Sequence, residues 1–284
     1  MQILQANIKT FQQKSEKYCS DFYIGSELEF YVFSSLSPLI SASQEQLQIF
    51  LANIPNCKTE QGLGQLEIVF IHTNNFLDLI NNIEQTKKNI YSLATQNNLW
   101  VSFAGKPLKN DCGSALQFSL SWLPKQQNNE NFIESFYIPM AVALLEKTKE
   151  NLAILNLFTS DYLRYCIKAN RSLFLQHKNT SPVNLSFGYN NRSCAIRITR
   201  AENIGGKNIK RLEYRVASAS ASPSLVLNFI ISTLNFGLEK YFISPATKHN
   251  SQGFGPIFGN AFDEQYELET MVSSWELAVL IQDV

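Results

Sequence analysis

Alternating hydrophobic and polar residues run through several short stretches of the chain and predict β-strands. The clearest example is FYIGSELEFYVF at positions 22–33, in which aromatic and aliphatic residues surround two glutamates. Comparable stretches predict further strands near positions 57–60, 65–72, 100–106, 114–122, 183–188, 194–200 and 209–216. The first two of these flank the turn Gln61-Gly62-Leu63-Gly64, so we expect them to form a hairpin.

Between these strands, apolar residues recur at helical spacing. In the longest predicted helix, about 75–97, the residues Phe76, Leu79, Ile80 and Ile83 fall on one face. Further helices are predicted near positions 3–18, 43–54, 132–148, 160–169, 223–241 and 274–282. The helix at 223–241 is expected to begin at Ser222-Pro223, with the serine as N-cap and the proline in the first position.

The order of these elements predicts the fold class. Pairs of consecutive strands joined by short connections, together with long helices, indicate an α+β fold in which an antiparallel sheet has helices on one face. The other face is then free to carry a site. No internal repeat and no Pro/Gly/Ser-rich linker divides the chain, so we expect residues 1–284 to form a single domain.

Composition narrows the class of protein further. Of the 284 residues, 45% are hydrophobic and 17% are charged, which is enough to bury a large core. The 24 basic and 24 acidic side chains cancel, so we expect no binding to nucleic acid or to an anionic membrane. Polar residues interrupt the apolar stretch 225–243, which favours a core-packed helix over a membrane span. The five scattered cysteines and the lack of a signal peptide predict free thiols in a reducing, cytoplasmic setting.

Two pairs of carboxylates lie on or beside the predicted strands. Glu27 and Glu29 are two residues apart, so they point to the same face of a strand and repel each other unless a cation or an arginine lies between them. Glu60 and Glu67 bracket the glycine-bearing turn. Alternative interpretations remain open, namely a solvated outer face for the first pair and an ordinary charged hairpin for the second.

Arginines on later strands add the opposite charge. Arg197 lies inside an apolar strand, and in RLEYR the residues Arg211, Glu213 and Arg215 alternate on one face. The alternative is a surface ladder of paired charges. Oxygen-only ligands suit Mg²⁺ or Mn²⁺, and arginines suit phosphate, so the combination indicates a phosphoryl-transfer site. The sequence has neither a P-loop nor a Rossmann glycine motif.

Several segments resemble the glutamine synthetase family, and they occur in the family's order over roughly residues 22–270. They are GSELEF, EQGLGQLEI, FAGKPLKNDCGSALQFSLSW, SPVNLSFGYNNRSCAIRI, RLEYRVASASASPSLVLNFII and FGNAFDEQYEL. The resemblance implies a curved antiparallel sheet with helices on one face, a guanido-kinase-like architecture. It also implies a ligase that activates a glutamate-like carboxylate as an acyl phosphate, using ATP and Mg²⁺ or Mn²⁺, for attack by ammonia or an amine.

The resemblance assigns a role to each matching position. The metal ligands that it implies are Glu29, Glu60 and Glu67 for one ion, Glu27 and Glu213 for a second ion, and Gln117 at a histidine position. The positions it places near ATP are Arg192, Arg197 and Ser121, of which the two arginines would also act on the transferring phosphoryl group. The substrate-binding positions are Gly113 and Arg215.

Other positions depart from the family pattern. Gln117 and Ser119 replace two histidines, and Cys112 replaces an asparagine. The family's flap glutamate, which helps to deprotonate ammonium, aligns with Thr180. A substrate-contacting arginine aligns with Phe174, and Arg171 is close enough in sequence to compensate. In place of the family's PD after RxExR stand Ala217 and Ser218.

Two hypotheses follow from this mixture of retained and lost residues. The first is a divergent ligase whose partners are a nucleotide and an amino acid or amine. The second is a catalytically degenerate homologue that acts as a binding or regulatory protein. Because only about 20 residues precede the first predicted catalytic strand, we expect that any oligomer differs from the ring in which the family's N-terminal β-grasp domain completes a neighbouring site.

Overall fold

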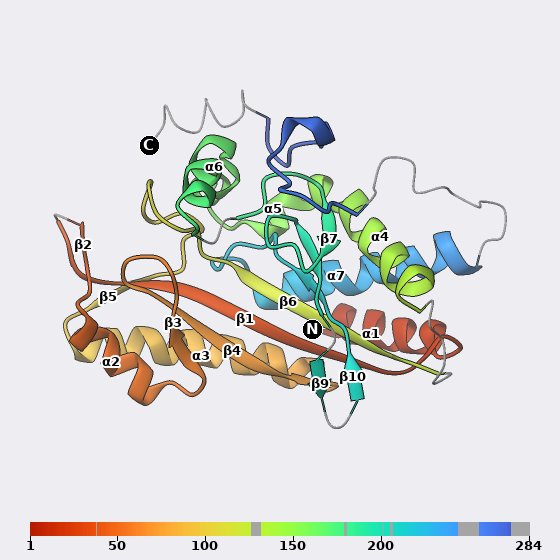
Figure 1. Ribbon diagram of the computed structural model, residues 1–284. Coiled ribbons are helices and arrows are strands. Elements are labelled where there is room, and N and C mark those ends of the chain that lie inside the picture. The colour runs from red at the N-terminus through yellow and green to blue at the C-terminus, as the bar shows by residue number, and fades with distance from the viewer. Residues whose placement is uncertain are drawn as a thin grey trace.

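The sheet is built around its longest strand, β1 (Cys19–Leu36), which crosses the molecule (Figure 1). The computed structural model describes residues 1–37, 39–125, 132–178, 181–200, 202–204, 207–243 and 256–273. Strand β1 pairs antiparallel with four others, which are β2 (Leu39–Ser41), β4 (Gln65–Thr73), β5 (Trp100–Ser102) and β6 (Leu116–Pro124). One strand therefore links the two halves of the sheet.

The remaining strands extend the sheet on both sides of this centre. They are β3 (Cys57–Thr59), β7 (Phe187–Tyr189), β8 (Ile196–Ile198) and β11 (Leu212–Tyr214). The order across the sheet is β3-β4-β1-β6-β11-β8-β7, and every pair is antiparallel except β7 with β8, which is parallel. Strands β9 (Glu202–Ile204) and β10 (Lys207–Ile209) form a separate two-stranded ribbon.

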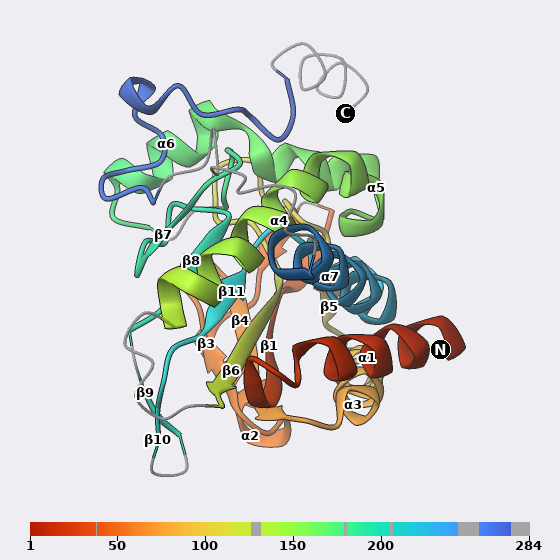
Figure 2. The ribbon, with the colours of Figure 1, turned by 90° about the vertical axis from the view of Figure 1, so that its right-hand side faces the viewer.

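Helices form the second layer of the structure. The α-helices are α1 (Gln2–Ser15), α2 (Gln44–Asn53), α3 (Phe76–Gln96), α4 (Ile138–Thr148), α5 (Leu152–Leu155), α6 (Ile167–Leu175) and α7 (Pro223–Leu238). Short 3₁₀ turns occupy Lys149–Asn151, Thr159–Tyr165 and Glu264–Tyr266, and π turns occupy Ile133–Tyr137 and Glu239–Ile243. Figure 2 shows α1, α3 and α7 on the same side of the sheet, so the fold is α+β with helices on one face.

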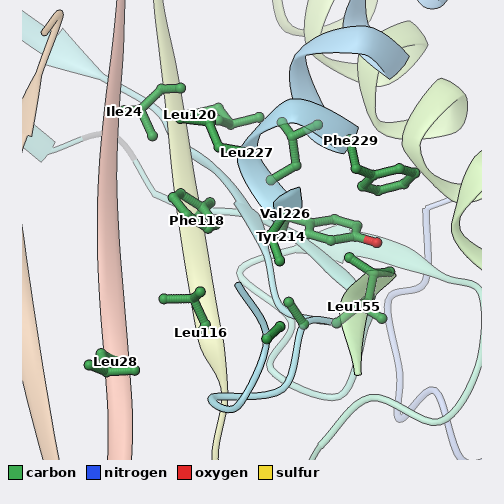
Figure 3. Packing of buried hydrophobic residues seen from close by; sticks show 14 of the residues in the cluster. Ile24, Leu28, Leu116, Phe118, Leu120, Leu155, Tyr214, Val226, Leu227 and Phe229 are labelled. Carbon is green, nitrogen blue, oxygen red and sulfur yellow. The ribbon is translucent and has the colours of Figure 1, made fainter. Parts of the chain in front are cut away.

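The two-residue period of the strands decides which side chains meet this helical layer. Leu28 of β1 and Leu116, Phe118 and Leu120 of β6 are buried and belong to the main core cluster, together with residues of α7 such as Leu227 (Figure 3). Because alternate residues of a strand point to opposite faces, the residues between them lie on the face away from α7. That second face carries the charged side chains described below.

Helix α1 completes the helical layer by packing along α7 (Figure 2). Leu4 and Phe11 are buried in the main core cluster. The side chain of Asn7 donates a hydrogen bond from Nδ2 to Asn228 Oδ1 (2.9 Å), and the backbone carbonyl oxygen of Asn7 accepts one from Asn235 Nδ2 (3.0 Å). These contacts attach the first helix to the same core as the sheet.

The predicted elements agree with the structure in type, with a few corrections. The predicted helix at 160–169 is wrong, because a 3₁₀ turn ends at Tyr165, Cys166 is extended, and α6 begins at Ile167. Ser222 precedes α7 as expected, but its side chain makes no capping hydrogen bond. Several strands are shorter than predicted, with β5 ending at Ser102. The helix expected at 274–282 lies outside the described residues.

The long apolar stretch at 225–243 packs inside the protein as α7 and the turn that follows it. Within the described ranges, no helix combines the length and the apolar character needed to cross a bilayer. All five cysteines are free thiols, as the sequence predicts.

Candidate active site

The charged residues of the sheet meet on the face opposite the helices. In the strand register, Glu29 of β1 lies directly across from Glu67 of β4, and Glu27 lies across from Gln117 of β6. Further along, Glu213 of β11 lies between Ser119 of β6 and Arg197 of β8. Pairing of β1, β4, β6, β8 and β11 thus places side chains from distant parts of the sequence in adjacent positions.

A pocket of about 450 Å³, including its open mouth, lies over this row of residues. The residues predicted from the sequence that line it are Glu27, Glu29, Glu60, Glu67, Gly113, Gln117, Arg192 and Arg215. Three other predicted residues, Arg197, Glu213 and Ser121, do not line it. Arg197 and Glu213 are nevertheless joined to it by the hydrogen bonds described next.

A continuous network connects the two ends of the charged row. Glu213 accepts from Arg197 Nη1 at Oε2 (3.0 Å) and from Arg215 Nη1 at Oε1 (2.5 Å). Arg215 Nη1 also donates to Gln117 Oε1 (3.0 Å), and Gln117 Nε2 donates to Glu29 Oε1 (2.9 Å). The neutral amide of Gln117 therefore bridges the arginine-rich end of the site and its acidic end.

The two ends differ in their electrostatics. Burial, followed by the charges of Glu67 and Glu60, raises the pKa of Glu29 to about 8. Burial and the charge of Glu27 raise the pKa of Glu67 to about 7. Burial acts in the same direction on Glu213, but Arg215 and Arg197 outweigh it and lower the pKa of that carboxyl. The carboxylates at the acidic end thus have too few positively charged neighbours to offset their burial and mutual repulsion.

A divalent cation would suit the chemistry of this acidic end. Its donors are all oxygens, as Mg²⁺ and Mn²⁺ prefer, and a cation would offset the repulsion between the facing carboxylates Glu29 and Glu67. As the side chains stand, however, the described residues contain no cluster of three or more His, Cys, Asp or Glu side chains that could hold a metal ion. Glu29 accepts one hydrogen bond at each oxygen, from Ala115 N and from Gln117 Nε2 (both 2.9 Å), which leaves one lone pair of each oxygen for a further partner.

Three segments, which carry Gly105, Gly113 and Ser181, lie close together at another wall of the pocket. A Cβ atom added at Gly113 would lie 2.5 Å from Ser181 Oγ and 3.0 Å from the carbonyl oxygen of Gly105. A larger residue would have to displace Ser181 or the Gly105 segment, which favours glycine at this position without reference to a ligand. Cys112 and Ser181 line the same wall.

Two cationic residues at the site were missed by the sequence reasoning. Arg164 is fully buried, lines the pocket and donates to the carbonyl oxygens of Val216 and Arg215. Lys58, on β3, lies across from Glu67 of β4, and the two side chains form an ion pair (2.9 Å). The position of Lys58, two residues before Glu60 on a predicted strand, was a signal that would have found it.

Arg171, which the sequence suggested as a substitute for the family's substrate-contacting arginine, does not line the pocket. Arg171 Nη2 donates to the carbonyl oxygen of Phe262 (2.8 Å), and neither Arg171 nor Phe174 lines the pocket. Ser121 is buried on the same strand face as Gln117, four residues further along β6, and its hydroxyl has no hydrogen-bond partner among the residues described. Thr180, at the position of the expected base, lies outside the described residues.

Comparison with known proteins gives the family of the chain. The family model described as glutamine synthetase, catalytic domain, matches residues 34–279. Gamma-glutamylputrescine synthetase of Escherichia coli is 28% identical over 203 residues, which make up 68% of this chain and 39% of that protein. Glutamine synthetase of Methanococcus voltae is 22% identical over 257 residues, or 81% of this chain and 54% of that protein. The chain thus spans about half, or less, of the length of these relatives.

Solved structures agree in their fold. A structure of GmaS with ADP superposes with a TM-score of 0.68 at 16% identity, over 99% of this chain and 68% of that one. Glutamine synthetase of Plasmodium falciparum gives a TM-score of 0.61 at 20% identity, over 84% of this chain and 55% of that one. The match of the family model over most of the chain shows that it belongs to the glutamine synthetase family and carries its ligase-like catalytic domain.

Proposed function

We propose that this chain is the catalytic part of an ATP-dependent ligase that joins a glutamate-like carboxylate to ammonia or an amine. The observation that supports this most strongly is the network on the open face of the sheet, in which Glu29, Gln117, Arg215, Glu213 and Arg197 are connected by hydrogen bonds. Opposite charges held side by side in this way suit a reaction that transfers phosphate. The similarity to a synthetase that acts on an amine supports the same class of reaction.

The proposed reaction has two steps. An oxygen of the substrate carboxylate forms a bond to the γ-phosphorus of ATP, the bond from that phosphorus to the β-γ bridging oxygen breaks, and ADP leaves. The amine nitrogen then attacks the carbonyl carbon of the acyl phosphate, inorganic phosphate leaves, and the nitrogen gives up a proton. The products are an amide, ADP and phosphate.

The acidic residues would hold two divalent cations, each of which, when bound, neutralises charge on the phosphates. The proposed ligands are Glu29, Glu60 and Glu67 for one ion and Glu27 and Glu213 for the other, and Gln117 is a further proposed ligand. Arg192 and Arg197 would bind phosphate oxygens, and Ser121 would lie by the nucleotide. Arg215 and Gly113 would contact the substrate. Arg197 and Arg215 each form an ion pair with Glu213 in the structure, which places positive charge beside the proposed phosphate site.

Measurement of ADP release tests the proposal. The protein is incubated with ATP, Mn²⁺, glutamate and a panel of amines, and we expect ADP to form only when an acid and an amine are both present. Arg192→Met, which alters an exposed residue at the pocket, should lower this rate by about a hundredfold, because it removes a charge that is useful in the transition state. Lys9→Met, the same kind of change on an exposed position of α1, should leave the rate unchanged.

A folded protein that binds the nucleotide but releases no ADP with any acid and amine would overturn the ligase proposal. It would favour the second candidate, a degenerate homologue that binds ligands without turnover. The substitutions at Gln117, Ser119 and Cys112 are the features that favour this alternative, since the family carries two histidines and an asparagine there.

We also propose that the 284 residues form a single domain that works in a reducing compartment. The contacts of α1 with α7 support the first point, because they join the start of the chain to the main core. The five free thiols support the second.

A further inference from the structure

Lys58 is a cation on the rim of the acidic end of the site. In the β3–β4 pair it lies directly opposite Glu67, and its ammonium nitrogen is 2.9 Å from Glu67 Oε1. The lysine side chain is 57% exposed, whereas that of Glu67 is only 7% exposed. The stem of the lysine thus lies in solvent at the edge of the sheet, and its charged end reaches inward to a buried carboxylate.

The ammonium group lies beside an acidic cluster. Besides its ion pair with Glu67, Lys58 precedes Glu60 by two residues, and both of these glutamates line the pocket. The cation at the other end of the network is Arg215, which donates to Gln117 and Glu213. Among the described residues, Lys58 is the one cation that forms an ion pair with Glu67.

We propose that Lys58 is a built-in counter-ion that competes with a divalent cation for the Glu67 carboxylate and thereby sets the metal affinity of the site. This inference rests on the proposed function, in which Glu67 is a metal ligand. Without metal, the lysine holds the carboxylate and limits the repulsion between Glu67 and Glu29. When metal binds, the ammonium leaves Glu67 Oε1 and turns to solvent.

The geometry explains why the two cations exclude each other. An ammonium group and a divalent ion at the same carboxylate oxygen repel each other, and each removes part of the negative charge that attracts the other. Lysine is suited to leaving, because its flexible four-carbon stem already lies at the surface and its ammonium is readily hydrated. Removal of the lysine therefore removes both a competitor for the carboxylate oxygen and a positive charge near the metal.

Titration of Mn²⁺ into the protein by calorimetry tests this inference. Lys58→Met, which keeps the length of the side chain and removes its charge, should bind Mn²⁺ about fivefold more tightly than the native protein, or better. Lys58→Arg keeps the charge and should bind no more tightly than the native protein. Lys9→Met removes a positive charge far from the site, on α1, and should match the native affinity. A thermal melt of each variant checks that it is folded.

A second measurement follows the lysine itself. The native protein is treated with a limiting amount of acetic anhydride, with and without Mn²⁺, and acetylation is measured peptide by peptide by mass spectrometry. Mn²⁺ should accelerate acetylation at Lys58, because its amine is released from Glu67 into solvent, and should not change acetylation at Lys9.

The possible outcomes separate this inference from the proposed function. If the native protein binds Mn²⁺ but Lys58→Met binds it equally or less tightly, the competition is overturned and the ligase proposal stands. The same holds if Mn²⁺ binds without any change at Lys58. If neither the native protein nor any variant binds Mn²⁺, with or without ADP, both the proposed metal site and the role of Lys58 are overturned.

Discussion

At the residue scale, the acidic end of the site contains carboxylates that bind protons more tightly than usual. Burial and neighbouring charge raise the pKa of Glu29 to about 8 and that of Glu67 to about 7. In the unfolded chain both groups return to ordinary glutamate values near 4.5, so the folded state binds more protons than the unfolded state between these limits. Stability is therefore linked to pH in the opposite direction from that of a salt-bridged carboxylate.

We expect the metal-free protein to lose stability as the pH rises. The contribution of the two protonated carboxyls is fully present below about pH 4.5 and is lost as the pH passes 7 to 8, so the free energy of unfolding should fall by on the order of a few kcal/mol between pH 5.5 and 8.5. Urea unfolding at several pH values measures this. Glu29→Gln should flatten the slope, whereas Glu16→Gln, at an exposed position, should not. A slope of the opposite sign in the native protein would contradict the prediction.

The sequence predicted the identity of these residues better than their partners. Alternation along the strand places Glu27 and Glu29 on one face, because a strand repeats every two residues. It does not say that Gln117 bridges Glu29 and Arg215, since that depends on the register between β1 and β6 and on side chains from three strands. Arg164 was missed because it lies in a 3₁₀ turn with no simple period.

At the element scale, a single aspartate ties together three loops around the pocket. Asp111 Oδ2 accepts from the backbone N–H of Leu63 in the β3–β4 turn (2.7 Å). Its Oδ1 accepts from Cys112 N (2.9 Å) and from Lys178 Nζ (3.0 Å), which follows α6. The turn that carries Glu60 is thereby held against the loop that carries Gly113.

Loss of this carboxylate should loosen the turn without unfolding the sheet. In Asp111→Ala the amide of Leu63 loses its acceptor, and we expect its hydrogen exchange to become about tenfold faster. Hydrogen-exchange mass spectrometry of the peptide around 60–65 measures the change, with Asp21→Ala at the start of β1 as the matched control. Unchanged exchange in this peptide would mean that the turn is held by its other contacts, such as Gln65 Oε1 with Gly62 N.

Strands and helices differed in how well the sequence predicted their ends. The long strand and the helix at Phe76–Gln96 were predicted closely, because their patterns continue over many residues. The strands β7, β8 and β11 have only three residues each, whereas the sequence indicated six or more, since buried apolar residues such as Leu185, Ala195 and Val216 flank the paired segments. The parallel pairing of β7 with β8 depends on the course of the intervening loop, which has no hydrophobic pattern.

At the scale of the whole molecule, the first helix contributes to the core shared by the rest of the chain. Phe11 is 0% exposed and its ring lies 4.9 Å from that of Phe22 on β1. Phe11→Ala should lower the free energy of unfolding by about 3–5 kcal/mol, because it leaves a cavity between α1 and the sheet. Ile3→Ala, on the same helix but 71% exposed, should change it by less than about 0.5 kcal/mol. Urea unfolding of both variants decides whether α1 is part of the cooperative unit.

The central position of β1 also has a consequence for synthesis of the protein. Strands β2 and β5 pair only with the end of this strand, so most of its length keeps both edges open until β4 and β6 follow it, and β6 ends only at Pro124. At ordinary rates of translation, the intervening chain takes on the order of ten seconds to emerge from the ribosome. During that interval an apolar strand with two free edges is exposed to other nascent chains. We therefore expect the yield of folded protein to depend on chaperones that bind early in translation.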